Sequence, residues 1–140
     1  MQTRRLARQR ALQALYQWEL NPGPVSGLLE QFLTTQDMEN VDMEYFTELL
    51  RQSIALCKEL DERLETYLDI PAAQLDPVER GILRLSAYEL IRRLDIPYRV
   101  IISEAVALAK KFGAEDGHKF INAVLDKAVS DWRPHEGRNR

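Results

Sequence analysis

Residues 97–129, PYRVIISEAVALAKKFGAEDGHKFINAVLDKAV, contain the clearest helical pattern of the chain. The first half places apolar side chains on one face of an α-helix: Ile101, Ala105, Leu108 and Phe112. The second half repeats the apolar spacing: Ile121, Val124, Leu125 and Ala128. We therefore expect two core-facing helices that are joined by FGAEDGHKF, residues 112–120, which we call the link.

Two residues of the link are of types that end and begin helices. Gly113 stands where a left-handed C-terminal cap is common. Asp116 is of a residue type that caps helix N-termini. The link should thus contain one helix end and one fresh helix start.

The rest of the chain also predicts helices. Apolar spacing and turn residues indicate helices over 3–20, 26–36, 41–59 and 61–69, and Asp76-Pro77 starts a strongly apolar helix that we expect to be central. The short helix over 26–36 carries four large apolar residues: Leu28, Leu29, Phe32 and Leu33. No segment has a strand pattern, so the expected fold is all-α, with six to seven helices in one domain over 1–132 and a disordered tail over 133–140.

Composition limits the possible functions. A chain of 140 residues suits one domain that needs no disulfide or metal. The single Cys57 allows no internal disulfide and is expected to be an inert core thiol, and no Cys/His cluster has zinc spacing. With no signal peptide and no long apolar run, we expect a cytoplasmic protein that does not contact a membrane.

Charge is unevenly distributed. The net charge is −3, but four arginines precede the first acidic residue, Glu19, and acids dominate residues 37–69. Arg4 and Arg8 extend the core stripe of the first helix, so its first turns are expected to overhang the body or fray. Arg4, Arg5 and Arg8, which we call the arm, are either a solvated helix end or a phosphate-binding group, with Tyr16 further along. The residues alone leave both interpretations open.

The link favours binding over catalysis. Free amides at a helix start suit an anion, glycines let a backbone approach closely, and a half-exposed Phe120 could stack on a base. Phe112 completes a core stripe, so burial is expected for it, and the lysines have an ordinary explanation as stabilisers of a helix C-terminus. His118 near Asp116 is weak support for a catalytic pair, and we expect no catalytic residues, metal site or cofactor.

Four segments together resemble the NusB family of bacterial transcription antitermination factors. They are RRLARQRALQALYQWEL (4–20), FLTTQDMENVDMEYFTELL (32–50), PVERGILRLSAYELIRRLDIPYRVIISEA (77–105) and SEAVALAKKFGAEDGHKFINAVLDK (103–127). They cover nearly the whole chain in the order and length of the family. The resemblance implies two small packed helical bundles.

The resemblance also implies partners. NusB pairs with NusE, a small-subunit ribosomal protein, and the pair binds boxA, a single-stranded RNA element. Both join an RNA polymerase elongation complex with other Nus factors, which transcribes ribosomal RNA operons processively. Some members form homodimers that cover the RNA surface, and the sequence does not decide this point.

Carried over by position, the resemblance assigns two groups of residues. RNA contact falls on Arg4, Arg5, Arg8, Tyr16, Lys111, Phe112, Gly113, Ala114, Asp116, Gly117, Lys119 and Phe120. NusE contact falls on Glu79, Arg80, Arg84 and Asp116. Lys111 and Gly117 depart from the residues of other members, which affects local detail only.

The leading hypothesis is an RNA-binding adaptor whose arm and link form one RNA surface. Single-stranded RNA suits it because unstacked bases can meet side chains. An acidic chain should bind RNA weakly alone, so a basic partner would be needed. The alternatives are a protein-binding helical adaptor without RNA specificity and an enzyme that uses His118 with Asp116 or Cys57.

Overall fold

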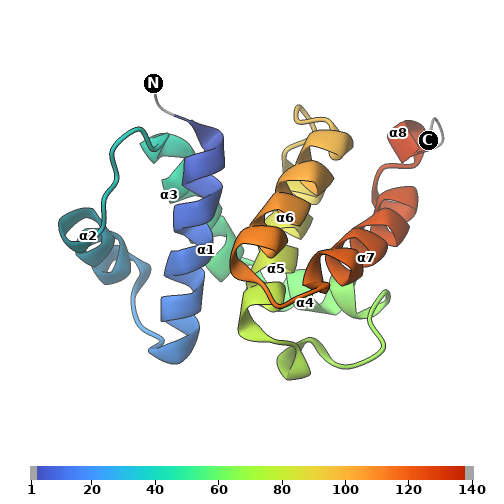
Figure 1. The fold of residues 1–140 in the computed structure, drawn as a ribbon, viewed down its shortest axis with the longest axis horizontal. Helices are drawn as coiled ribbons and strands as arrows, with labels where there is room; N and C mark the ends of the chain where they lie inside the picture. The colour runs from blue at the N-terminus through green and yellow to red at the C-terminus, as the bar shows by residue number, and fades with distance from the viewer. Residues whose placement is uncertain (1–2, 138–140) are drawn as a thin grey trace. The chain divides into compact units, whose positions relative to one another are not determined.

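A computed structural model describes residues 3–137, whose regular structure is helical apart from one isolated β-bridge (Figure 1). The prediction of an all-α fold is confirmed for these residues. The chain divides into two units, residues 1–57 and residues 58–140. That the two units act as one domain stays a prediction.

The first unit contains three helices, α1 (Arg4–Leu20), α2 (Val25–Thr35) and α3 (Met43–Ala55). Helix α1 packs along α3, and α2 contacts both (Figure 1). Small alanines on α1 allow the close approach to α3, and the rings of Phe32 and Phe46 stack with centroids 5.9 Å apart. Leu28, Leu29 and Phe32 of α2 are buried, whereas Leu33 is 53% exposed.

The start of α1 is held in place. The Thr3 hydroxyl accepts a hydrogen bond from the Leu6 amide at 3.1 Å, which caps the helix. Thr3 also forms the bridge to Val41: its amide donates to the Asn40 carbonyl at 2.7 Å, and its carbonyl accepts from the Asp42 amide at 3.1 Å. The expectation that the first turns overhang or fray is therefore wrong.

The second unit is built around α5 (Pro77–Arg92), which packs against α6 (Tyr98–Phe112) and α7 (Gly117–Trp132) (Figure 1). Every residue from Gly81 to Leu90 is buried, so the prediction of a central helix is confirmed. Its start follows the sequence signal, since Asp76 accepts from the Glu79 amide at 3.3 Å and Pro77 occupies the first turn.

Two shorter elements precede α5. The predicted helix over 41–59 ends early, because Leu56 leaves helical geometry with φ −102° and ψ 8°. Helix α4 (Cys57–Glu65) starts directly afterwards, so the predicted piece over 61–69 begins and ends sooner than expected. The 3-10 helix η1 (Ala72–Gln74) then leads to α5. Cys57 is half-buried at the start of α4, not in the core.

The C-terminal segment differs from the expected disordered tail. Helix α8 (Pro134–Gly137) follows α7, and the Arg133 side chain before it is buried, with 4% of the residue exposed. Its guanidinium donates to the carbonyls of Glu89, Leu90, Arg93 and Ile96 and to the Glu136 carboxylate, at 2.6 to 3.2 Å. Disorder is therefore the wrong description of residues 133–137; residues 138–140 lie outside the described residues.

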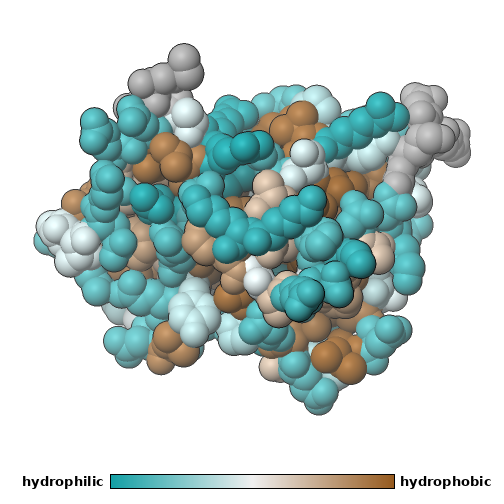
Figure 2. Space-filling model, in the orientation of Figure 1, coloured by the Kyte–Doolittle hydropathy of each residue, from teal (hydrophilic) through white to brown (hydrophobic). Residues whose placement is uncertain are grey.

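The surface carries few apolar side chains. Figure 2 shows a face that is mainly hydrophilic, with small hydrophobic areas. The large apolar side chains exposed among the described residues are Tyr16, Leu20, Leu33, Ile70, Leu94 and Val100. Within residues 3–137, no helix has the length and apolar character that crossing a membrane requires.

Candidate nucleic-acid interface

The arm divides into exposed and buried arginines. Arg4 and Arg5 are exposed on the first turn of α1, whereas Arg8 is 4% exposed. The guanidinium carbons of Arg4 and Arg8 lie 4.5 Å and 5.4 Å from the ring centroid of Tyr45, a buried residue of α3. Both distances suit a cation–π interaction. Arg8 thus stabilises the first unit, while Arg4 and Arg5 present charge to solvent.

Tyr16 lies three turns further along α1. It is 42% exposed, which leaves its ring accessible to a planar group such as a base. Tyr45 is the residue of this region that the sequence did not point out. It lies about forty positions from the arginines that it contacts, so no local pattern could have linked them.

The backbone of the link differs from the sequence prediction at two residues. Gly113 has φ −89° and ψ 178°, so it is extended rather than left-handed. A glycine is required there for space, because a Cβ would stand 2.7 Å from the Ala109 carbonyl oxygen. Asp116 is the left-handed residue, with φ 66°, and its side chain makes no capping hydrogen bond. Its carboxylate instead accepts from the Lys119 ammonium at 3.2 Å.

The lysine of the link and Lys111, which directly precedes the link, are exposed, and the two aromatic rings of the link are half exposed. Lys111, Ala114, Asp116 and Lys119 are exposed, while Phe120 is half-buried, as expected. Phe112 was expected to be buried but is also half-buried, and the Lys111 ammonium lies 5.5 Å from its ring centroid. Two aromatic edges and two exposed lysines are therefore close together in sequence and available on one short segment.

The first turn of α7 already has a carboxylate beside it. Gly117 is buried, and a Cβ added to it would stand 2.9 Å from Oε2 of Glu79. Burial, together with the nearby Asp76 carboxylate, raises the pKa of Glu79. The amides of Gly117 and Lys119 donate to the carbonyls of Ala114 and Asp116 at 3.0 and 3.1 Å. These features leave less room for a bound phosphate than the sequence suggested.

The predicted NusE-contact residues of α5 divide in a similar way. Arg80 donates to the carbonyls of Ala72, Ala73 and Leu75 at 2.9 to 3.2 Å, which fixes η1 against α5. Arg84 is buried and forms a bidentate pair with Asp61 of α4, with N–O distances of 2.8 and 2.7 Å. Both arginines thus hold the second unit together, and direct contact of either with a partner stays a prediction.

The arm and Tyr16 belong to the first unit, while the link and the start of α5 belong to the second. A common RNA surface made from both therefore stays a prediction. Within residues 3–137, no cluster of three or more His, Cys, Asp or Glu side chains could hold a metal ion.

The fold and these two surface regions define a small all-helical binding protein. The sequence model of the NusB family matches residues 5–130, and the chain belongs to the NusB family. It is 49% identical over 133 residues to the transcription antitermination protein NusB of Pseudoalteromonas atlantica, covering 95% of each chain. It is 51% identical over 131 residues to the NusB protein of Idiomarina loihiensis, covering 94% of each.

Solved structures agree with this assignment. NusB of T. maritima has a TM-score of 0.85 and 32% identity, with 100% of both chains covered. A NusB chain solved as antitermination factors NusB and NusE in complex with double-stranded RNA has a TM-score of 0.77 and 28% identity. That match covers 91% of this chain and 96% of the other.

Proposed function

We propose that this chain is a transcription antitermination factor that pairs with NusE and binds boxA RNA, so that RNA polymerase elongates processively through ribosomal RNA operons. The observation that carries the proposal is family membership along nearly the whole chain, at 49% identity over 95% of its length. A structural neighbour that was solved with NusE and RNA supports both partners.

The arm would supply the electrostatic attraction. Arg4 and Arg5 are exposed and can each neutralise a phosphate, while Arg8 keeps the helix start rigid through Tyr45. Tyr16 offers a ring to a base further along the same helix. In this division of roles, phosphate contacts position the RNA and aromatic contacts hold its bases.

The link, together with Lys111 directly before it, would supply the second set of contacts. Lys111 and Lys119 can reach phosphates, and the half-buried rings of Phe112 and Phe120 can stack on unpaired bases. Gly113 and Ala114 carry little or no side chain, so the RNA backbone can approach the link closely beside Asp116, whereas Gly117 is buried and would act through the position of the first turn of α7.

NusE would bind near the start of α5. Glu79 and Asp116 are the acidic residues proposed to contact NusE there, and Arg80 and Arg84 shape the region through the contacts described above. A basic ribosomal protein docked there would offset the net charge of −3, which opposes RNA binding by the chain alone.

The chain would act as a non-enzymatic adaptor in the cytoplasm, where bacterial RNA is transcribed. It acts within an elongation complex that contains RNA polymerase and other Nus factors. A homodimer that covers the arm or the link would compete with RNA, so RNA should shift such a dimer to monomer.

A gel-shift titration tests the proposal. The full chain, NusE and an equimolar mixture are each titrated against boxA single strand, a scrambled single strand and a boxA-containing duplex. We expect the mixture to bind boxA more tightly than either protein does and more tightly than it binds the other two RNAs. Equal affinity of the mixture for boxA and scrambled RNA would instead identify an adaptor without RNA specificity.

A further inference from the structure

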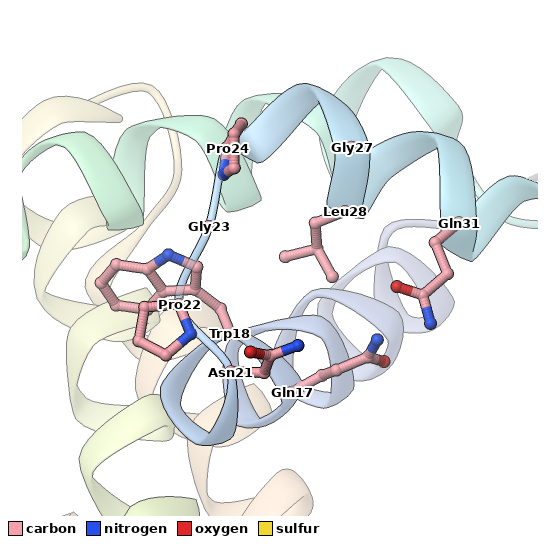
Figure 3. A pocket seen from close by; sticks show the side chains of 9 residues that line it. All are labelled: Gln17, Trp18, Asn21, Pro22, Gly23, Pro24, Gly27, Leu28 and Gln31. Carbon is pink, nitrogen blue, oxygen red and sulfur yellow. The ribbon is translucent and has the colours of Figure 1, made fainter.

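The first unit has a small pocket between the end of α1, the turn over 21–24 and the first half of α2 (Figure 3). Its volume is about 180 Å³, and its walls come from Gln17, Trp18, Asn21, Pro22, Gly23, Pro24, Gly27, Leu28 and Gln31. Figure 3 shows Leu28 and Gln31 on α2 facing Gln17 and Asn21 on the α1 side. We call this site the Trp18 pocket.

The Trp18 pocket has an aromatic plane and hydrogen-bonding groups without charge. None of the nine lining residues is ionisable. The side-chain amides of Gln17, Asn21 and Gln31 each offer donors and an acceptor. Within residues 3–137 these three amides have no hydrogen-bond partner, so they are available to a ligand. The lining therefore suits a neutral planar group with polar edges, not a phosphate.

Two glycines keep the Trp18 pocket open. A Cβ built on Gly23 or Gly27 would meet nothing within 4 Å, and neither residue has a positive φ. Gly27 is the third residue of α2, and its φ is not positive, so alanine could adopt the same backbone geometry. Neither backbone geometry nor packing requires it. The one structural effect of glycine at this position is the space that it leaves.

Size limits the possible occupant. A cavity of about 150 Å³ accepts one benzene-sized ring, and pockets for drug-sized ligands hold about 300–1,000 Å³. A volume of 180 Å³ therefore fits one heteroaromatic ring system. A proline-rich peptide would need a longer, aromatic-lined groove.

We propose that the Trp18 pocket binds one unpaired nucleobase of an RNA strand that runs along α1. The base stacks on the Trp18 indole, and the amides of Gln17, Asn21 and Gln31 pair with its edge. Exposed Tyr16 directly precedes Gln17 on the same helix and would hold a neighbouring base. This inference rests on the proposed RNA-binding function and adds a base-specific site to it.

Tryptophan fluorescence gives a local readout. The chain has two tryptophans, Trp18 and Trp132, and Trp132 makes an edge contact with Tyr67 that phenylalanine can keep. In the full-length Trp132→Phe protein with NusE, boxA single strand should quench Trp18 at the same midpoint as the gel shift. A proline-rich peptide serves as the competing probe.

Variants of α2 test the same site by affinity. Gly27→Leu fills the Trp18 pocket and should weaken binding of boxA RNA by about 5- to 140-fold, the loss of one stacked base. Ser26→Leu adds the same side chain to an exposed position outside the lining and should leave affinity unchanged. Gln31→Ala, also exposed, should weaken binding without a packing change, so the test holds even if Gly27→Leu does not fold.

The outcomes separate the two proposals. Trp18 quenching by RNA together with the loss in Gly27→Leu and Gln31→Ala supports the base site. RNA binding by gel shift with neither effect overturns the base site and leaves the proposed function standing. Quenching by the peptide but not by RNA makes the Trp18 pocket a peptide site and overturns the inference. Absence of RNA binding by every protein mixture overturns both proposals.

Discussion

Oε2 of Glu79 lies 2.9 Å from the point where a Cβ would stand on Gly117. The first turn of α5 and the first turn of α7 therefore meet at a glycine, where any side chain would require the Glu79 carboxylate to move. Glu79 is a predicted NusE contact and Gly117 a predicted RNA contact. A ligand that moves one of these turns should also change the position of the other, because the two turns are in contact within the second unit.

The raised pKa of Glu79 predicts a pH-dependent contribution to stability. Burial and the Asp76 carboxylate favour the protonated form in the folded state. This stabilisation is complete below the ordinary pKa and is lost as the pH rises through the folded-state pKa. The side chain of the Glu79→Gln variant cannot ionise. The melting temperature of the variant, measured relative to that of the native protein, should therefore increase as the pH is raised from about 4 to neutral. A difference in melting temperature that stays constant across this range would contradict the prediction.

Gly117→Ala should change the contact with Glu79 without unfolding the protein. The group in the way is the end of a flexible carboxylate side chain, so the fold can adapt. Thermal unfolding should therefore change little. NusE titrations of Gly117→Ala, Glu79→Ala and the double variant should give a coupling energy of about 0.5–3 kcal/mol. Additive effects would mean that the contact plays no part in partner binding.

Phe120→Ala tests the stacking role of the link. The ring is half-buried, so it can keep a packing contact and still present an edge to a base. If it stacks, its removal should weaken boxA binding in the presence of NusE by about 1–3 kcal/mol. Leu94→Ala, at an exposed apolar residue of the same unit, is the control for surface truncation. Unchanged affinity with the fold intact would assign Phe120 to packing alone.

Arg133→Ala should destabilise the second unit strongly. The buried guanidinium satisfies four main-chain carbonyls around the end of α5, and Glu136 bonds both to it and to the Tyr98 amide. Loss of these charge-assisted bonds should cost about 3–5 kcal/mol in chemical denaturation. Lys127→Ala, at an exposed cation of α7 in the same unit, is the control and should have little effect. Equal stability of Arg133→Ala and the native chain would restore the disordered-tail interpretation.

The sequence predicted what depends on neighbours along the chain. Apolar periodicity identified the long helices, and the capping signal of Asp76 and Pro77 placed the start of α5 correctly. It failed at Leu56, where α3 ends without a proline or glycine to mark the break. Local rules favour continuation there, so the neighbouring residues do not reveal the break.

The sequence also failed to predict which arginines are buried, because the groups that contact them lie far away along the chain. Arg133 was assigned to a solvated tail because its acceptors lie about forty residues earlier, at the end of α5. Arg8 was expected to be solvated or frayed because Tyr45 is equally remote. A sequence shows that an arginine is present, but not which distant carbonyl or ring makes its burial possible.

Arg5→Ala and Arg8→Ala should separate the two roles of the arm. Arg5 is exposed, so its removal should leave the melting temperature unchanged and reduce the salt dependence of boxA binding by about one counterion. Arg8 is buried against Tyr45, so its removal should destabilise the chain by about 1–2 kcal/mol and alter the salt slope less. The measurements are thermal unfolding of each variant and its affinity for boxA RNA at several salt concentrations. NusE is present in the binding measurements. If Arg8→Ala lowers the slope as much as Arg5→Ala and leaves the melting temperature unchanged, its charge reaches the RNA and the structural role assigned to it is wrong.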